Sequence, residues 1–524
     1  MGLKSIFSRS SVAKYARGIR EAPRSVICNT TLLSSALLYA LGGLAMTWEQ
    51  GASAVTPSLR GFQEQFGIKS GSDASSIQTY VSIIYIGYAI GAALSFLIND
   101  YIGRRWAYRL YSTVFIIGQM TACFSPNVKA LIGARIVSGL GIGSLSVIGP
   151  MAIVEIAPQE IRGLLTSWYT VSMGVALTTA NFCVLGIYKN VPTGKLQYQI
   201  PLIAISVFVF LCIVASFFVS ESPRWLMLVG RREEATEALT RLRRLPADHP
   251  RISSELSSIQ ASIISAAGDV EGNNNFLAIV KETFTVSSNL RRLNSANSMT
   301  TYFIPIMKML RNGSDIDKSE DIFLSGMYGF SKLWFSLIAS FFFIDVLGRR
   351  RSLFIGIAVQ MVSHIYIGVF IKYNQEGTVS VAASRGAIAA LFVHAFGYAV
   401  GLFILPYVFG GELWPNRIRS FGGAVGQTFH WLFIYAIKFS VPDLLKATDN
   451  WGAFLFFAGW CFVGLIYVYL MVPEVAGLSV EEIDEVFEGS WLNALKTTRR
   501  PRSVEGQPDG QSDTGKGSSE NEKV

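Results

Sequence analysis

The chain has 524 residues, of which 51% are hydrophobic and only 15% are charged, with a formal net charge of +9. Soluble globular proteins carry about 25% charged residues, whereas the apolar residues of this chain gather in long blocks. A helix needs about 20 apolar residues to cross the ~30 Å hydrocarbon core of a bilayer, and the blocks have roughly that length. The composition excludes a soluble enzyme and predicts an all-α polytopic membrane protein.

The positive charge lies in short loops and at the two ends of the chain, without the aromatic interleaving or basic helices of a nucleic-acid-binding module. Lys and Arg are enriched in the cytoplasmic loops of membrane proteins, so we interpret the charge as a topology signal and expect no nucleic-acid partner. No pair among the five cysteines has the spacing of metal ligands. We expect neither a metal nor a cofactor.

In chain order, residues 1–31 are predicted to be a basic cytoplasmic tail and residues 32–220 a first bundle of six helices. The apolar blocks place these helices near 32–57, 75–98, 107–124, 129–154, 163–187 and 199–219. A cytoplasmic helical linker is expected at 221–290. Within it, the stretches 231–244 and 252–264 have the periodicity of short amphipathic helices.

Residues 291–473 are predicted to form a second bundle, with helices near 322–344, 352–372, 386–411, 421–442 and 451–472. The expected seventh helix is anomalous, because only fifteen residues separate Arg292 from Lys308 and many of them are polar. We interpret this segment as a re-entrant or broken helix, or as a helix that has lost part of its length. Such a loss would arise from a splice variant, a gene-model error or degeneration. Residues 474–524 form a second cytoplasmic tail, expected to be disordered after about residue 500 because its composition is polar.

Two motifs occur at equivalent places in both halves. Asp-x-x-Gly-Arg-Arg follows the second and the eighth helix, and a glutamate at the end of the fourth or tenth helix precedes an arginine at the start of the next. The repeated side chains are Asp100, Arg104, Arg105, Glu155 and Arg162, then Asp345, Arg349, Arg350, Glu412 and Arg419. A repeat of this kind indicates a duplicated six-helix unit.

The glycine of the first motif permits a tight turn, and its arginines can bond helix carbonyls and the carboxylates of neighbouring helices. We interpret the ten side chains as a cytoplasmic gate. The gate would tie the two halves together in an outward-facing state and would break when the halves rock apart. The alternative is that these charges only stop the helices at the membrane surface.

Several further segments resemble the sugar porter family of the major facilitator superfamily, of the fungal hexose or quinate permease type. These segments are Arg135-x-x-x-Gly-x-Gly-x-Gly143, Pro150-x-x-x-x-Glu155, Pro158-x-Glu-x-Arg162-Gly163, Glu221-Ser-Pro-Arg-Trp-Leu226 and Pro473-Glu474…Gly477-Leu-Ser-x-Glu-Glu-Ile483. The resemblance covers nearly the whole chain. It implies twelve helices in the major facilitator fold, two pseudo-symmetric six-helix bundles, alternating access, and uniport or proton symport of sugars, polyols or related hydroxylated molecules.

Glu49 stands in the first helix where many proton-coupled members of that family carry an aspartate, and Arg135 resembles the arginine that pairs with this acid. An ionisable side chain inside the bilayer is costly and indicates function by default. Protonation of Glu49 would break the pair and release the halves, which would couple a proton to transport. The alternative is a static structural pair in a facilitator.

The family resemblance places five candidate substrate-binding residues: Asn297, Tyr302, Tyr407, His430 and Trp431. A sixth candidate, Lys332 in the eighth helix, comes from its charge and not from the family pattern. Several amides of the family pattern are missing, including the glutamine of the fifth helix, which favours another hydroxylated solute over a plain hexose. Lys332 and His430 are able to face a carboxylate such as that of quinate. The alternatives are a packing histidine and a lysine that snorkels or bonds a carbonyl. Asn312 heads a glycosylation sequon expected outside the cell.

We therefore predict a secondary active transporter that moves a sugar-like or hydroxylated small organic solute by alternating access and proton symport. Its expected partners are the solute, protons and the lipid bilayer. We expect a monomer in the plasma membrane with both termini in the cytoplasm. Two alternatives are an export carrier for a secondary metabolite and a non-transporting nutrient sensor.

Overall fold

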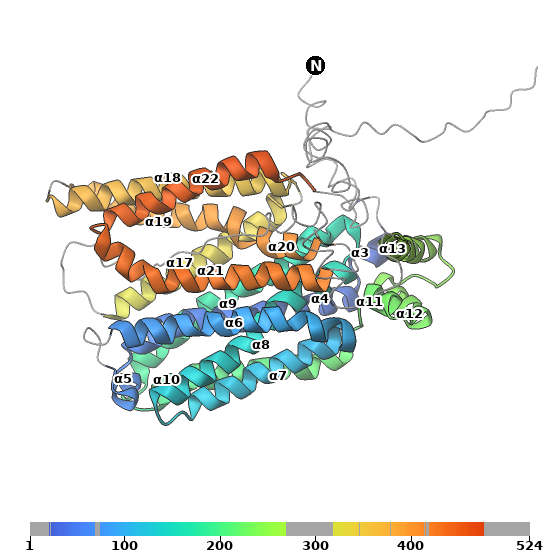
Figure 1. Cartoon of the computed structure of the whole chain (residues 1–524), viewed down its shortest axis with the longest axis horizontal. Coiled ribbons are helices and arrows are strands. Elements are labelled where there is room, and N and C mark those ends of the chain that lie inside the picture. Colours follow the sequence, from blue (N-terminus) through green and yellow to red (C-terminus); the bar gives the residue numbers. More distant parts are fainter. Residues whose placement is uncertain are drawn as a thin grey trace, which may run out of the picture.

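The computed structural model describes residues 20, 23–68, 74–268, 318–344, 346–377, 379–412, 414 and 419–475. Over these ranges the chain is helical, and no strand occurs in them. The long helices run side by side in two groups, one from each half of the chain (Figure 1). Within the described ranges, nine helical segments are long and apolar enough to cross a membrane. The predicted fold class is therefore confirmed for the part of the chain that the structure describes.

The first group contains six long helices and several short elements near its ends, among them η1 (Thr56–Ser58) and η3 (Ser216–Phe218). The long helices are α4 (Thr30–Val55), α6 (Ala74–Ile102), α7 (Arg104–Cys123), α8 (Val128–Ile156), α9 (Arg162–Asn190) and α10 (Leu196–Ala215). The other short elements are α3 (Arg24–Ile27), α5 (Arg60–Phe66) and the 3-10 turn η2 (Gln159–Ile161). Asparagine begins two of the long helices, because the Asn29 side chain accepts from Thr31 N and that of Asn127 from Ala130 N.

Helix α8 lies at the centre of the first group, where it contacts α4, α6 and α7. Its apolar residues surround the whole helix, as expected for a helix with protein on every side. Glycines allow the close approach: a Cβ on Gly139 would lie 2.8 Å from the Cα of Gly87 on α6, and one on Gly141 would lie 2.6 Å from Phe115 N on α7. Small residues at such contacts let helix backbones pack closely in membranes.

Three shorter helices follow the first group: α11 (Pro223–Leu228), α12 (Arg232–Arg243) and α13 (Pro250–Gly268). Their apolar faces meet in a small core that includes Trp225, Leu239 and Leu256. All three lie at one end of the molecule, beside the start of α4, whereas α5 lies at the other end (Figure 1). We refer to these two ends as the α12/α13 end and the α5 end.

The second group consists of α17 (Lys318–Phe342), α18 (Arg349–Gln375), α19 (Val381–Tyr398), α20 (Leu405–Glu412), α21 (Arg419–Ala447) and α22 (Trp451–Met471). Helices α19 and α20 are one span interrupted by a π-helical segment, η4 (Ala399–Phe403). Pro406 has no N–H for the helix ladder, which is a usual cause of such a break. At this break Gly401 packs directly on Gly356 of α18, because a Cβ on Gly356 would lie 2.6 Å from the Cα of Gly401.

The two groups meet along two pairs of helices, α9 with α17 and α6 with α21. Gly174 lets α9 approach α17, since a Cβ there would lie 2.9 Å from the Cα of Leu333. Aromatic side chains fill the α6–α21 contact, where the ring centroids of Phe96 and Phe421 lie 4.9 Å apart. The expected short seventh helix, residues 293–307, lies outside the described residues.

Candidate functional site

A buried ion pair joins α4 and α8 in the part of the first group nearer to the α5 end. Arg135 Nη1 donates to Glu49 Oε1 at 2.6 Å, and Gln119 Nε2 on α7 donates to Glu49 Oε2 at 2.8 Å. The guanidinium carbon of Arg135 lies 4.0 Å from the ring centroid of Tyr80 on α6. The side chains of Glu49 and Arg135 are each 3% exposed. Four helices therefore converge on one carboxylate.

Arg135 contacts an aromatic ring as well as the carboxylate of Glu49. Ionised Glu49 accepts two hydrogen bonds, one of them charge-assisted from Arg135. Without that charge, Arg135 still keeps the face of Tyr80, and a desolvated cation–π contact contributes about 2 kcal/mol. A small cavity lined by Glu49, Arg135, Gln119 and Tyr80 adjoins the pair. The site therefore places a carboxylate, an arginine, an amide and an aromatic ring together inside the helix bundle.

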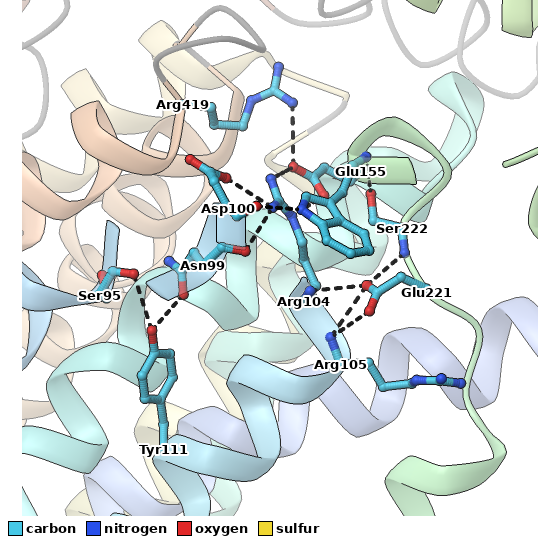
Figure 2. A network of polar contacts seen from close by, with 11 residues as sticks. Ser95, Asn99, Asp100, Arg104, Arg105, Tyr111, Glu155, Glu221, Ser222 and Arg419 are labelled. Atoms are coloured by element: carbon cyan, nitrogen blue, oxygen red, sulfur yellow. Dashed lines mark hydrogen bonds and ion pairs between the residues drawn. The ribbon is translucent and has the colours of Figure 1, made fainter. Parts of the chain in front are cut away.

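A second buried network centres on Glu155, at the other end of α8 (Figure 2). Arg104 donates Nε to Glu155 Oε2 and Nη2 to Glu155 Oε1, both at 2.8 Å. Its Nη1 bonds Asp100 Oδ1 at 3.0 Å. Arg419 Nη1, on α21 of the second group, lies 3.9 Å from Glu155 Oε1. One carboxylate is thus shared by guanidinium groups from the two helix groups.

The turn before α7 is held by a carboxylate that the sequence interpretation did not single out. Gly103 has φ +86°, and the backbone N–H groups of Arg104 and Arg105 donate to Glu221 at 3.0 and 3.1 Å. Figure 2 shows Glu221 pointing at both N–H groups. Burial raises the pKa of Glu221, while the hydrogen bonds from Ser222 and Arg105 and the charge of Arg104 act in the opposite direction.

The second group contains an equivalent turn, with the same Gly-Arg-Arg sequence and a glutamate that accepts from its N–H groups. Gly348 has φ +97°, and the N–H groups of Arg349 and Arg350 donate to Glu474 Oε1 and Oε2 at 2.7 and 3.1 Å. The Arg350 guanidinium also donates to the Tyr469 carbonyl at 2.6 Å. Glu221 and Glu474 both follow the last long helix of their group. Their equivalent positions in the sequence were the signal from which a shared role could have been predicted.

Polar contacts attach α12 and α13 to the same end of α8 and α9. The buried guanidinium of Arg243 donates to the Ile156 carbonyl at 2.9 Å and pairs with Glu255 at 3.1 Å. Arg251 pairs with Glu160 of η2 at 2.7 Å. Arg162 begins α9 and lines a cavity between η2 and α13 together with Glu155. These contacts attach α12 and α13 to the segments that flank the Glu155 network.

The candidate substrate residues of the described ranges lie where the two groups meet. Trp431 donates its Nε1–H to Ser146 Oγ of α8 at 3.0 Å. The rings of Tyr407 and Tyr169 lie 5.2 Å apart, and that of His430 lies 4.7 Å from Trp431. Lys332 Nζ lies 4.6 and 4.8 Å from the ring centroids of Tyr328 and Tyr398. His430 therefore packs against aromatic rings, and Lys332 contacts the rings of Tyr328 and Tyr398.

The family model described as "Sugar (and other) transporter" matches residues 35–487, which is most of the chain and includes both networks. The chain belongs to this family. Its similarity extends to a low-affinity glucose transporter of Saccharomyces cerevisiae, HXT3, with 30% identity over 90% of this chain and 84% of that protein. A probable quinate permease of Aspergillus flavus is 28% identical over 83% of this chain and 84% of that protein.

Among solved structures, the proton:xylose symporter XylE bound to 6-bromo-6-deoxy-D-glucose matches with a TM-score of 0.74 and 19% identity, over 87% of this chain and 99% of that one. The inward-open form of XylE from E. coli matches with a TM-score of 0.62 and 20% identity, over 87% and 99%. Both matches show the major facilitator fold. The chain is therefore a multi-pass membrane transporter of a sugar transporter family, and the expected family resemblance is confirmed.

Several candidate residues of this sugar transporter family member lie outside the described residues. They are Asn297, Tyr302, Asn312 and Asp345, together with the tail expected to be disordered after about residue 500. Glu412 ends α20. Arg349 is 3% exposed at the start of α18. The repeated motifs are thus described at Asp100, Arg104, Arg105 and Glu155 in one group and at Arg349, Arg350 and Arg419 in the other.

Proposed function

We propose that this chain is a proton-coupled carrier for a sugar-like or hydroxylated small organic solute, in which Glu49 is the proton acceptor. The observation that carries the proposal is the buried cluster of Glu49, Arg135, Gln119 and Tyr80. A carboxylate in a membrane protein interior is costly unless it has a task or a fixed partner. Here the partner, Arg135, keeps a second contact with Tyr80 when the carboxylate is neutral. The similarity to a proton:xylose symporter also supports the proposal.

Helix α8 supports a mechanical link between proton and gate. Arg135 and Glu155 are 20 positions apart on it, which corresponds to about 30 Å at 1.5 Å per residue. Helix α8 is continuous from Arg135 to Glu155, with Pro150 between them, and packs closely against α6 and α7 through glycines, so we propose that it transmits movement between the two sites. Release of Arg135 at one end would then change the position of Glu155 relative to Arg419 at the other. The ion pair between the two groups is the part of the gate that must open.

We further propose that the α12/α13 end faces the cytoplasm and that the protein acts as a monomer in the plasma membrane. The Arg104–Arg105 and Arg349–Arg351 segments lie at that end, and Lys and Arg are enriched on the cytoplasmic side. We propose the helix bundles at 32–220 and 291–473, the linker at 221–290 and the tails at 1–31 and 474–524. Antibody access to tags at both ends in intact and permeabilised cells tests this orientation.

The test of the proposed function is solute uptake by the full chain in transporter-deficient cells. The panel contains radiolabelled hexoses, pentoses, polyols and quinate, each measured with and without a protonophore. We expect at least one solute to accumulate, and we expect the protonophore to abolish the accumulation. Glu49→Gln keeps the shape of the side chain and removes its charge, so it should leave only downhill exchange of the same solute.

The matched control is Glu64→Gln, which changes an exposed carboxylate on α5 at the same end of the molecule. This control should accumulate solute as the wild type does. Uptake in the wild type that resists the protonophore and is unaffected by Glu49→Gln would refute proton coupling. Absence of uptake for every solute, with the protein at the cell surface, would refute import and favour an export carrier or a sensor.

A further inference from the structure

A buried arginine on α7 belongs to neither of the two ion-pair networks. Arg109 is 6% exposed, and it donates from Nε to Ser216 Oγ at 2.8 Å and from Nη2 to the Ser216 carbonyl at 3.0 Å. Its guanidinium carbon lies 4.5 Å from the ring centroid of Trp106 and 3.8 Å from that of Phe217. Among the described residues, no carboxylate forms an ion pair with it. A buried charge of this kind in a membrane protein indicates a function.

A second arginine lies one helical turn before it and is bonded to the same turn of the chain. Arg105 Nη1 donates to the Val219 carbonyl at 3.1 Å, and the Val219 N–H in turn donates to the Ser216 carbonyl, which Arg109 also binds. Figure 2 shows the Arg105 side chain extending away from Glu221. Its buried Nε has no hydrogen-bond partner. The two guanidinium groups are therefore fixed on neighbouring carbonyls of η3 and keep unused donors.

The side chains around these arginines are apolar and exposed. Trp106 is 54% exposed, Phe217 57% and Phe218 85%, and the rings of Trp106 and Phe217 lie 6.5 Å apart. Exposed apolar side chains on a membrane-spanning bundle contact lipid, and Trp is enriched at the boundary between hydrocarbon and headgroups. Arg109 lies about 8 Å along α7 from its first residue. The headgroup region of one leaflet is about 5–8 Å thick, so both arginines lie near the level of the lipid phosphates.

The equivalent turn of the second group shows that Arg109 is not needed to build the turn. Counted from the glycine of the repeated Gly-Arg-Arg sequence, the position of Arg109 is occupied in α18 by Phe354, which is 41% exposed. Both turns are nevertheless held in the same way, by a glutamate that accepts from backbone N–H groups. The buried charge of Arg109 is therefore an addition to the first group that the turn itself does not explain.

We propose that Arg105 and Arg109 bind the phosphate of an anionic phospholipid in the leaflet at the α12/α13 end. Guanidinium groups present several N–H donors in a geometry that suits phosphate oxygens. The acyl chains would lie against Trp106, Phe217 and Phe218. An anionic headgroup is favoured over a zwitterionic one, because it adds a net negative charge beside two cations. The site goes beyond the proposed function, since it does not depend on which solute is carried.

The test measures lipid binding by native mass spectrometry of the purified, delipidated full chain. The protein is titrated with dioleoylphosphatidylglycerol or dioleoylphosphatidylcholine, which share their acyl chains and phosphate and differ in headgroup charge. The variants are Arg105→Gln, Arg109→Gln and Arg109→Lys, which keeps the charge. Lys129→Gln is the matched control, because it removes an exposed positive charge at the opposite end of α8 from Glu155. Thermal unfolding shows which variants are folded.

We expect the wild type to bind its first phosphatidylglycerol at least about ten-fold more tightly than its first phosphatidylcholine, because two arginines attract the anionic headgroup. Arg105→Gln and Arg109→Gln should each lower this preference about five-fold. Arg109→Lys and Lys129→Gln should keep it. If Arg109 only links α7 to η3, Arg109→Gln will lower the unfolding temperature and leave the lipid preference unchanged.

Equal binding of the two lipids by the wild type would overturn the proposal, as would an unchanged preference in both glutamine variants. A loss in Lys129→Gln as large as that in Arg105→Gln would also overturn it, since the preference would then follow total charge and not this site. If Arg109→Gln does not fold, Arg105→Gln decides, because Arg105 is half-buried and its replacement leaves the bonds of Arg109 to Ser216 in place.

Discussion

The two ends of helix α8 carry buried ion pairs that differ in what they connect. The pair of Glu49 and Arg135 lies within the first helix group, and its remaining contacts are an amide and an aromatic ring. Glu155 instead binds Arg104 of its own group and Arg419 of the other, and both arginines are 1% exposed. Removal of the first carboxylate would affect one buried arginine. Removal of the second would affect two, of which Arg104 would keep Asp100.

This difference matches the two roles proposed above. In the proposed function Glu49 binds a proton, and the Tyr80 ring gives Arg135 a contact that does not depend on the charge of Glu49. In the proposed gate the carboxylate of Glu155 links the two groups. The four predictions below use substitutions that should separate the two behaviours.

The largest expected effect on stability is that of Glu155→Gln. Loss of the charge removes the buried carboxylate that Arg104 and Arg419 share, and leaves Arg104 with Asp100, whose side chain is 46% exposed. Breaking a buried pair in this way costs about 3–5 kcal/mol. We expect a clear decrease in the thermal unfolding temperature of the purified protein in detergent. A decrease no larger than that for Glu49→Gln would contradict the contrast between the two ends of α8.

For Glu49→Gln itself we expect a smaller loss of stability, about 1.5–3 kcal/mol, the range for hydrogen bonds to charged groups. The amide can still accept from Arg135, and Tyr80 still covers the guanidinium. The unfolding temperature should therefore lie between that of the wild type and that of Glu155→Gln. The unfolding temperatures of all three proteins are measured under the same detergent conditions. A loss of stability in Glu49→Gln equal to that in Glu155→Gln would show that Glu49 is only structural.

Alanine substitutions at the two equivalent turns test whether the helix groups use the same device. Gly103 has φ +86° and ψ 172°, and Gly348 has φ +97° and ψ 157°. A residue other than glycine adopts this backbone conformation at a strain cost of about 1–3 kcal/mol. A Cβ would also meet Glu221 Oε2 at 2.9 Å and the Glu474 carboxylate at closer range. We expect both variants to lose stability.

Gly67→Ala is the control for the turns, since Gly67 has φ +67° with ψ 19° and a Cβ there would meet no atom within 4 Å. Only the left-handed strain of about 1–2 kcal/mol applies at that position. Equal losses at Gly67, Gly103 and Gly348 in thermal unfolding would show that contact with Glu221 and Glu474 is unimportant.

The smallest effect should follow from Glu234→Ala on α12. Its side chain is 52% exposed and pairs with Arg231, which is 51% exposed. Solvent and salt screen such pairs, so the loss should be about 0.5 kcal/mol or less. The unfolding temperature should match that of the wild type at low and high salt, and a marked decrease at low salt would mean that this pair belongs to the gate.

Much of the architecture followed from hydropathy and charge along the chain. The helices predicted at 129–154 and 451–472 correspond to α8 (Val128–Ile156) and α22 (Trp451–Met471), with ends shifted by two residues or fewer. The amphipathic stretches at 231–244 and 252–264 correspond to α12 and α13. Such features depend on local composition, so one sequence is enough to find them. The break of the tenth helix at Ala399–Phe403 was not predicted, because it depends on packing against Gly356 as well as on Pro406.

By itself, the sequence determined that the chain is a helical membrane protein of two related halves, and which side chains repeat between them. Only the tertiary structure decided which charges meet. Gln119 and Tyr80 complete the Glu49 site, and Glu221 and Glu474 hold the two turns, although none of these contacts is local in the chain. The physical reason is that hydropathy and turn signals act within one helix, whereas an ion pair depends on the rotation and packing of helices far apart in the sequence.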